Sequence, residues 1–284
     1  MSDLSNTAHN KVRQAKDLKY QPGFSYITWL ALFILYAPIL ILVLYSFNAN
    51  RSVVVWTSFS TDWYVKAWHN EGIQSAALIS LEVAVIAMVL STTFATMAAL
   101  VTTRTPPYKG MNISIAIINQ PLMIPEIVTA VATLIFFAVI KKATGANGIG
   151  FLITAHTVFC IPFAYMPIRA RLEDMDLSLE QAAADLYASP LMVFKRVTLP
   201  LMMPGVLSGA MLAFIVSVDD VVISLFVGGP GETTLPLYIL GQIRRGVTPE
   251  VNAVSTVFLG ISVILVTLIF LFGRPKSTRP EKSQ

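Results

Sequence analysis

Residues 75–101 decide the fold class of this chain, because they read SAALISLEVAVIAMVLSTTFATMAALV, and Glu82 is the only charged residue among them. A helix of about 20 apolar residues is long enough to cross the hydrocarbon core of a bilayer. We therefore predict that these residues form a membrane-spanning helix.

Five further stretches have the same apolar character: 27–47, 113–139, 151–171, 201–224 and 251–272. The composition agrees, since only 13% of the 284 residues are charged and 55% are hydrophobic, whereas soluble domains carry about 25% charged residues. A soluble enzyme is thereby excluded. We predict an all-α polytopic membrane protein of six transmembrane helices, with tails at 1–26 and 273–284 and one transmembrane domain at 27–272, whose core is 75–272.

The basic residues predict the orientation of the chain. When the connecting segments are assigned alternately to the two sides, 14 of the 20 Lys and Arg residues fall on the side that holds both tails. Positive charge accumulates on the cytoplasmic side of membrane proteins. Both termini are therefore expected in the cytoplasm. The same clustering beside apolar runs argues against a nucleic-acid partner.

Two of the outer loops contain short amphipathic stretches. In the first, Trp63, Tyr64 and Trp68 share one face of a helix, which is typical of an interfacial helix in the aromatic belt. A ligand-binding role for these rings is the alternative. In the third, the turn residues from Gly228 precede an apolar segment that starts at Leu235, and we expect a short helix there.

The longest inner loop, 172–200, is expected to form two short helices. Ser178 and Gln181 have the spacing of a capping box, which predicts a helix from Ser178 to about Tyr187. Ser189 before Pro190 is a second start signal. Exposed apolar residues in such a loop, including Leu186, indicate either a contact site for another protein or a surface hairpin without a partner.

This loop resembles the "EAA" loop of permease subunits of bacterial ABC importers. The family pattern aligns without gaps on Ala182-Ala183 and Leu199-Pro200, but its Glu is Gln181 here and its Gly is Tyr187. In that family the loop is a coupling helix that enters a cleft of the ATP-hydrolysing subunit. The resemblance assigns this role to Glu180, Gln181, Ala182, Ala183, Asp185, Leu186, Tyr187, Leu199 and Pro200.

The resemblance extends from Leu35 to about Leu271 and is greatest to the second permease subunit of putrescine and spermidine importers. It rests on short segments: Leu35-Tyr-Ala-Pro, Tyr45-Ser-Phe-Asn, Trp63-Tyr64, Pro125-Glu126, His156-Thr-Val-Phe-Cys160, Ser217-Val-Asp-Asp220 and Pro249-Glu-Val-Asn-Ala253. It implies the type I importer permease fold and a place in the bacterial inner membrane. The implied partners are a second homologous permease subunit, two ATP-binding subunits and a periplasmic binding protein. No cofactor is implied.

Four acidic residues fall within the predicted spans: Glu82, Glu126, Asp219 and Asp220. A charged carboxylate that faced lipid would cost about 2.5–3.5 kcal/mol, so we expect these groups to face protein or a water cavity. Carboxylates at this depth suit a cationic substrate, because its ammonium groups lose water on entry. We therefore propose them as the substrate pathway; structural hydrogen bonding to neighbouring helices is the alternative. Pro121 and Pro125 favour a broken helix next to Glu126.

Other function classes fit the sequence less well. Ser208-Gly209 together with His156 resembles the active site of an intramembrane serine protease. That motif requires Gly two residues before the Ser, however, and this chain has Val206 there. The three histidines lie in separate compartments, so no metal site is expected. No phosphate-binding P-loop motif occurs, so ATP hydrolysis would belong to another chain. A secondary carrier that needs no ATP, or a permease for another organic cation such as a quaternary amine, stays open.

Overall fold

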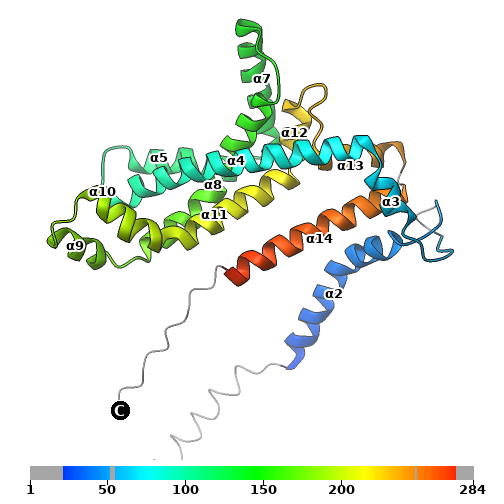
Figure 1. The fold of residues 1–284 in the computed structure, drawn as a ribbon, viewed down its shortest axis with the longest axis horizontal. Helices are drawn as coiled ribbons and strands as arrows, with labels where there is room; N and C mark the ends of the chain where they lie inside the picture. Colours follow the sequence, from blue (N-terminus) through cyan, green and yellow to red (C-terminus); the bar gives the residue numbers. More distant parts are fainter. Residues whose placement is uncertain (1–21, 52–54, 247, 273–284) are drawn as a thin grey trace, which may run out of the picture.

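The computed structural model describes residues 22–51, 55–246 and 248–272, and this part of the chain is almost entirely helical (Figure 1). Its membrane-scale helices are α2 (Pro22–Tyr45), α4 (Glu71–Arg104), α7 (Glu126–Thr144), α8 (Gly150–Glu173), α11 (Leu199–Asp219) and α14 (Pro249–Phe272). The shorter ones are α3 (Asp62–Trp68), α5 (Met111–Ile118), α6 (Gln120–Met123), α9 (Ser178–Asp185), α10 (Pro190–Val193), α12 (Val222–Val227) and α13 (Leu235–Arg245). Within the described ranges, the only β-type pairing is an isolated bridge between Asn48 and Phe59.

The all-α membrane fold is confirmed. Five helices of the described chain are long and apolar enough to cross a bilayer. One of the five is Pro190–Asp219, in which α10 and α11 form a single helix. The sixth apolar helix, α14, is the last described element. The predicted first span, 27–47, corresponds to α2, which begins earlier at Pro22 and ends at Tyr45. Most of the predicted N-terminal tail and all of the C-terminal tail lie outside the described residues.

The core is built from α4, α8 and α11, which pack against one another along their lengths (Figure 1). On α4 the buried face consists mainly of small side chains: Ala76, Ser80, Ala84, Ala87, Ser91, Ala95 and Ala99. Small residues let helix backbones approach closely, which is how helices associate where lipid removes the hydrophobic driving force. The larger buried side chains, such as Tyr165 and Ile168, come from α8.

Two glycines bring α11 against α8. A Cβ atom at Gly209 would lie 2.7 Å from the carbonyl oxygen of Ala164, and one at Gly205 would lie 2.6 Å from the Cβ of Arg171. Both neighbours belong to the same chain. The Gly205-x-x-x-Gly209 pattern therefore seats the fifth span within its own subunit.

The connecting helices gather at the two ends of this core. The α9–α10 hairpin lies at one end, and α3 and α13 lie at the other (Figure 1). The expected helices in the first and third outer loops are present as α3 and α13. Trp63 and Tyr64 connect α3 to the residues that follow α2. Trp63 Nε1 donates to the Asn48 carbonyl at 2.9 Å, and Tyr64 Oη lies 2.6 Å from Ser46 Oγ.

Two of the six predicted spans are not continuous helices. The third, predicted over 113–139, is divided into α5, α6 and α7, and the fifth, predicted over 201–224, is divided between α11 and α12. The division between α6 and α7 occurs next to Glu126, and the division between α11 and α12 occurs at Asp220.

Candidate functional site

The break in the third span places Glu126 at the first position of α7. Ile124 and Pro125 before it have extended backbones, with ψ of 140° and 130°. The ring of a proline disfavours helical geometry at the preceding residue and removes a hydrogen-bond donor, so Pro125 ends the helix that Pro121 begins. The Glu126 side chain is half-buried.

The break in the fifth span is made by Asp220, whose backbone is extended (φ −67°, ψ 129°) between α11 and α12. Its buried carboxylate then accepts hydrogen bonds from the first turn of α12. Ser224 N lies 3.0 Å from Oδ1, and Ile223 N lies 3.4 Å from Oδ2. The aspartate therefore caps the helix that follows it, since the free N–H groups at a helix start need acceptors.

These two breaks bring two carboxyl groups together. Helix α12 packs against α7, and the Glu126 carboxyl lies near the Asp220 carboxyl. Two ionised carboxylates this close repel each other, and a cation held between them relieves that repulsion. One turn along α7 from Glu126, the buried Thr129 Oγ1 has no hydrogen-bond partner among the described residues.

His156 joins this cluster, although sequence reasoning gave it no role in the pathway. It lies on α8, and its Nε2 is 3.6 Å from Asp220 Oδ1. The sequence shows that His156 lies in an apolar span. Its contacts with Ser217 and Asp220 depend on the packing of α8 against α11, which the sequence does not show.

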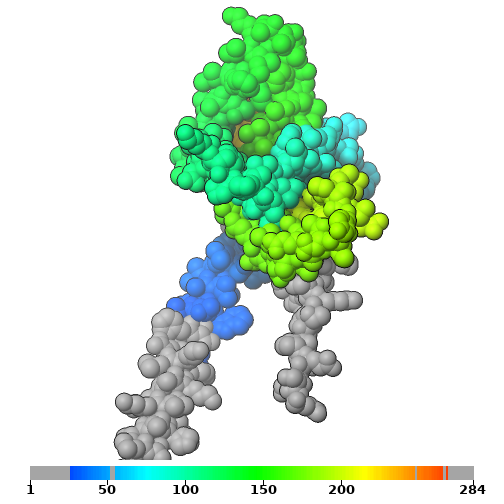
Figure 2. Space-filling view, turned by 90° about the vertical axis from the view of Figure 1, so that its left-hand side faces the viewer, coloured from blue at the N-terminus to red at the C-terminus, as the bar shows by residue number. Residues whose placement is uncertain are grey.

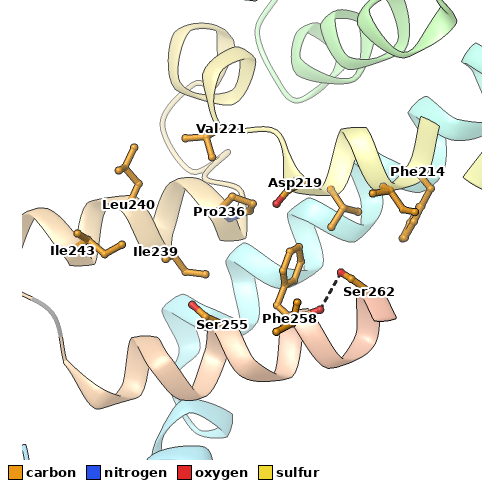
Figure 3. Close-up of a pocket in the computed structure, with 13 residues that line it drawn as sticks. Phe214, Asp219, Val221, Pro236, Ile239, Leu240, Ile243, Ser255, Phe258 and Ser262 are labelled. Atoms are coloured by element: carbon orange, nitrogen blue, oxygen red, sulfur yellow. Dashed lines mark hydrogen bonds between the residues drawn. The ribbon is translucent and has the colours of Figure 1, made fainter. Parts of the chain in front are cut away.

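Asp219 points elsewhere. Unlike its neighbour, it is exposed, and it lines a pocket of ≈ 480 Å³ between the end of α11 and helices α13 and α14 (Figure 3). The other labelled side chains around the pocket are mostly apolar, among them Ile239 and Ile243 of α13 and Phe258 of α14. Asp219 and Asp220 therefore do not share one cavity within this chain.

Glu82 is exposed on α4, away from the buried small-residue face of that helix. The structure does not bring it to Glu126 or Asp220 within the chain.

The α9–α10 hairpin retains the geometry of a glycine turn without the glycine. Ala188 N donates to Ala183 O at 3.2 Å, and Tyr187 N donates to Ala184 O at 2.9 Å. This pair of bonds is a Schellman motif, whose C′ residue adopts a left-handed backbone. Tyr187 holds that position with φ of 60°, the only non-glycine residue of the described chain with positive φ.

The hairpin presents an apolar surface at one end of the molecule. Tyr187 is 99% exposed and Leu186 is 82% exposed, and the neighbouring Leu191 and Met192 are also exposed. Figure 2 faces this end of the molecule, with the hairpin in yellow-green at the surface. Of the remaining candidate residues, Gln181, Ala182, Asp185 and Pro200 are exposed, and Ala183 and Leu199 are half-buried.

Glu180 has a partner within the chain. Both of its carboxylate oxygens lie 3.2 Å from Nε of Arg104 at the end of α4, and Thr198 Oγ1 donates to Oε1 at 2.9 Å. Thr198 belongs to a π-helical turn, Phe194–Thr198, that joins α10 to α11. Glu180 therefore fastens the hairpin to the core.

The start of α9 differs from the predicted capping box. The helix begins at Ser178 as expected, but the Ser178 side chain makes no capping bond. Instead, Ser178 N donates to Asp176 Oδ1 at 2.9 Å, and this bond lowers the pKa of the Asp176 carboxyl. An aspartate two residues earlier thus supplies the acceptor, so Gln181 is not needed as a cap and stays exposed.

The comparison with known families decides what kind of protein carries this site. Residues 22–274 match the family described as "Binding-protein-dependent transport system inner membrane component". The chain belongs to this family. It is a multi-pass membrane component of such a transport system, and members of this kind are permease subunits rather than enzymes.

Relatives and solved structures agree with this assignment. The putrescine transport system permease protein PotI of Escherichia coli (strain K12) is 39% identical over 86% of this chain and 89% of its own length. The spermidine/putrescine transport system permease protein PotC of the same strain is 35% identical over 86% and 90%. A chain of a bacterial ABC transporter that imports alginate superposes with a TM-score of 0.63 at 18% identity, covering 91% of this chain and 99% of that one.

Proposed function

We propose that this chain is one of two permease subunits of an ATP-driven importer that carries a small organic cation, a di- or polyamine such as putrescine or spermidine, across the inner membrane. The observation that carries the proposal is the pairing of Glu126 with Asp220 where two membrane helices are broken. An alkyl diamine offers ammonium groups that donate charge-assisted hydrogen bonds to such a pair. The names of the relatives support this substrate class.

The other acids take part only in the assembled pair of subunits. Asp219 and Glu82 are exposed in the single chain, and a charged group that faced lipid would be costly. A second permease subunit would cover both and would close the ≈ 480 Å³ pocket beside Asp219 into part of the pathway. Several separated acids, rather than one tight cage, favour release of the substrate on the inner side.

The α9–α10 hairpin is the proposed docking site for an ATP-binding subunit. It is the only connecting segment of the described chain that presents exposed Leu, Met and Tyr side chains beside a left-handed turn. With both termini in the cytoplasm, this end of the core faces the cytoplasm, and α3 and α13 face the periplasm and the binding protein.

The test is uptake of labelled putrescine by cells that carry the complete transport system. Asp220→Asn and Glu126→Gln should each lower the maximal rate about tenfold or more at matched levels of assembled complex, because each removes a charge partner of the ammonium group. Basal ATP hydrolysis should persist, since the hairpin is unchanged. Wild-type uptake in both variants would refute a pathway role for the pair.

Two alternatives are tested in the same cells. A quaternary amine has no N–H to donate to a carboxylate, so it should compete poorly with putrescine; strong competition would move the substrate class towards quaternary amines. Depletion of ATP at a constant proton gradient should stop uptake, whereas continued uptake would indicate a secondary carrier.

A further inference from the structure

His156 is a buried ionisable side chain beside the carboxyl pair, with 1% of its surface exposed. It projects from α8 towards the junction of α11 and α12. Both ring nitrogens have partners. Nδ1 lies 2.8 Å from Ser217 Oγ on α11, and Nε2 lies 3.1 Å from Ser224 Oγ on α12. One imidazole therefore connects the two helix segments on either side of the break.

The connection on the α12 side continues to Asp220. Ser224 Oγ lies 3.4 Å from Asp220 Oδ1, and His156 Nε2 lies 3.6 Å from the same oxygen. The Ser224 backbone N–H also donates to this oxygen at 3.0 Å. Oδ1 is thus held between the first turn of α12 and the imidazole, which leaves the carboxyl little freedom to rotate.

The connection on the α11 side has a different character. Ser217 is buried and contacts Nδ1, but it contacts neither Asp220 nor Glu126 by a hydrogen bond. The two ring nitrogens therefore have separable consequences: Nδ1 secures the ring, and Nε2 reaches the carboxyl.

Burial of these polar atoms is costly unless every one is bonded, and an apolar side chain could fill the same volume without that cost. A buried polar network with all members bonded fixes one geometry. The geometry fixed here is that of the carboxyl beside Glu126, at a break that a continuous helix would not have.

We propose that His156 is a positioning residue for cation transport: through Nε2 and Ser224 it holds Asp220 at the break between α11 and α12, where Asp220 meets Glu126. This inference rests on the proposed function, because it assigns the role of His156 through the Asp220–Glu126 pair. His156 itself does not contact the substrate.

Two amide substitutions separate the two nitrogens. The terminal amide of Gln reaches the place of Nε2, and that of the shorter Asn reaches the place of Nδ1. In the complete transport system, at matched levels of assembled complex, His156→Gln should retain maximal putrescine uptake within about threefold, whereas His156→Asn should lose about tenfold. The half-saturating concentration should stay within about twofold in both, since the binding protein delivers the substrate.

A second pair of variants keeps the imidazole and guards against misfolding. Ser224→Ala should lower the maximal rate as His156→Asn does, and Ser217→Ala should leave it within about twofold of wild type. Equal losses in Ser217→Ala and Ser224→Ala, or equal losses in the Gln and Asn variants, would show that His156 only fills the core and would overturn the inference.

The double variant His156→Asn, Asp220→Asn separates failure of this inference from failure of the proposed function. If the histidine acts through the aspartate, the double variant should transport no less than Asp220→Asn alone, because effects along one chain of contacts are not additive. Independent, multiplying losses would overturn the positioning role. Wild-type uptake by Asp220→Asn alone would instead refute the proposed function.

Discussion

Gly209 shows how one missing methyl group determines the packing of the core. A Cβ at this position would lie 2.7 Å from a backbone oxygen of α8, which cannot move aside as a side chain can. Gly209→Ala should therefore push α11 away from α8 and destabilise the protein by about 1–3 kcal/mol. The measurement is the thermal unfolding midpoint of the detergent-solubilised complex.

Gly241 supplies the matched control for that substitution. It also lies in a helix, α13, but a Cβ there would meet nothing within 4 Å. Gly241→Ala should leave the midpoint unchanged or raise it slightly, because alanine is the better helix former by about 1 kcal/mol. Equal effects of the two substitutions would show that α8 and α11 are not in close contact at Gly209.

At the same scale, the sequence indicates which residues are unusual but not which of them meet. Glu126 and Asp220 were predictable as pathway candidates because acids are costly in a membrane. Their pairing, and the separation of Asp219 from Asp220, were not predictable, since both depend on the direction of each side chain at a helix break. The role of Asp176 as the cap of α9 was missed because Ser178 offered a more familiar motif.

At the scale of elements, the hairpin keeps a left-handed turn at the cost of placing Tyr187 in it. A left-handed backbone costs a residue with a Cβ about 1 kcal/mol or more in conformational free energy. Contacts within the described chain do not offset this cost, because the Tyr187 side chain is 99% exposed. Tyr187→Gly should therefore strengthen the Schellman bonds. Amide hydrogen exchange at residues 187 and 188 should slow about fivefold in the isolated subunit.

Asp185→Gly is the control, because it introduces the same residue two positions earlier, within the last turn of α9. There the backbone is helical and glycine is unfavourable, so exchange at the same amides should accelerate. Acceleration in Tyr187→Gly as well would mean that the turn is not strained at Tyr187.

The helix breaks show where element prediction from sequence succeeds and where it fails. Pro121 and Pro125 predict the break before α7, because each lacks a backbone N–H donor and disfavours helical geometry at the preceding residue. No proline or glycine marks the break at Asp220. It depends on the hydrogen bonds that the Asp220 carboxylate accepts from α12 and on His156 from a distant helix. Hydrophobicity alone therefore predicts an uninterrupted fifth span.

At the scale of the whole molecule, α7 is too exposed for a helix that carries part of the site. It stands away from the α4–α8–α11 core (Figure 1) and packs mainly on the short helix α12. Its uncovered apolar side chains are Ile127, Val128, Val131, Leu134, Ile135, Phe136 and Val139. Because Glu126 begins this helix and cannot face lipid at low cost, we expect the second permease subunit to cover the neighbouring face of α7.

A nitroxide spin label at Ile127→Cys tests this arrangement in bilayers. Cys160 is the only native cysteine, and it is fully buried with its Sγ directed at the Ala213 carbonyl, so the unsubstituted protein serves as the unlabelled blank. Collision of the label with oxygen, which concentrates in lipid, should fall when the second permease subunit is present. If collision is the same with and without that subunit, this face of α7 lies against lipid, and the carboxyl pair must be shielded by its own chain alone.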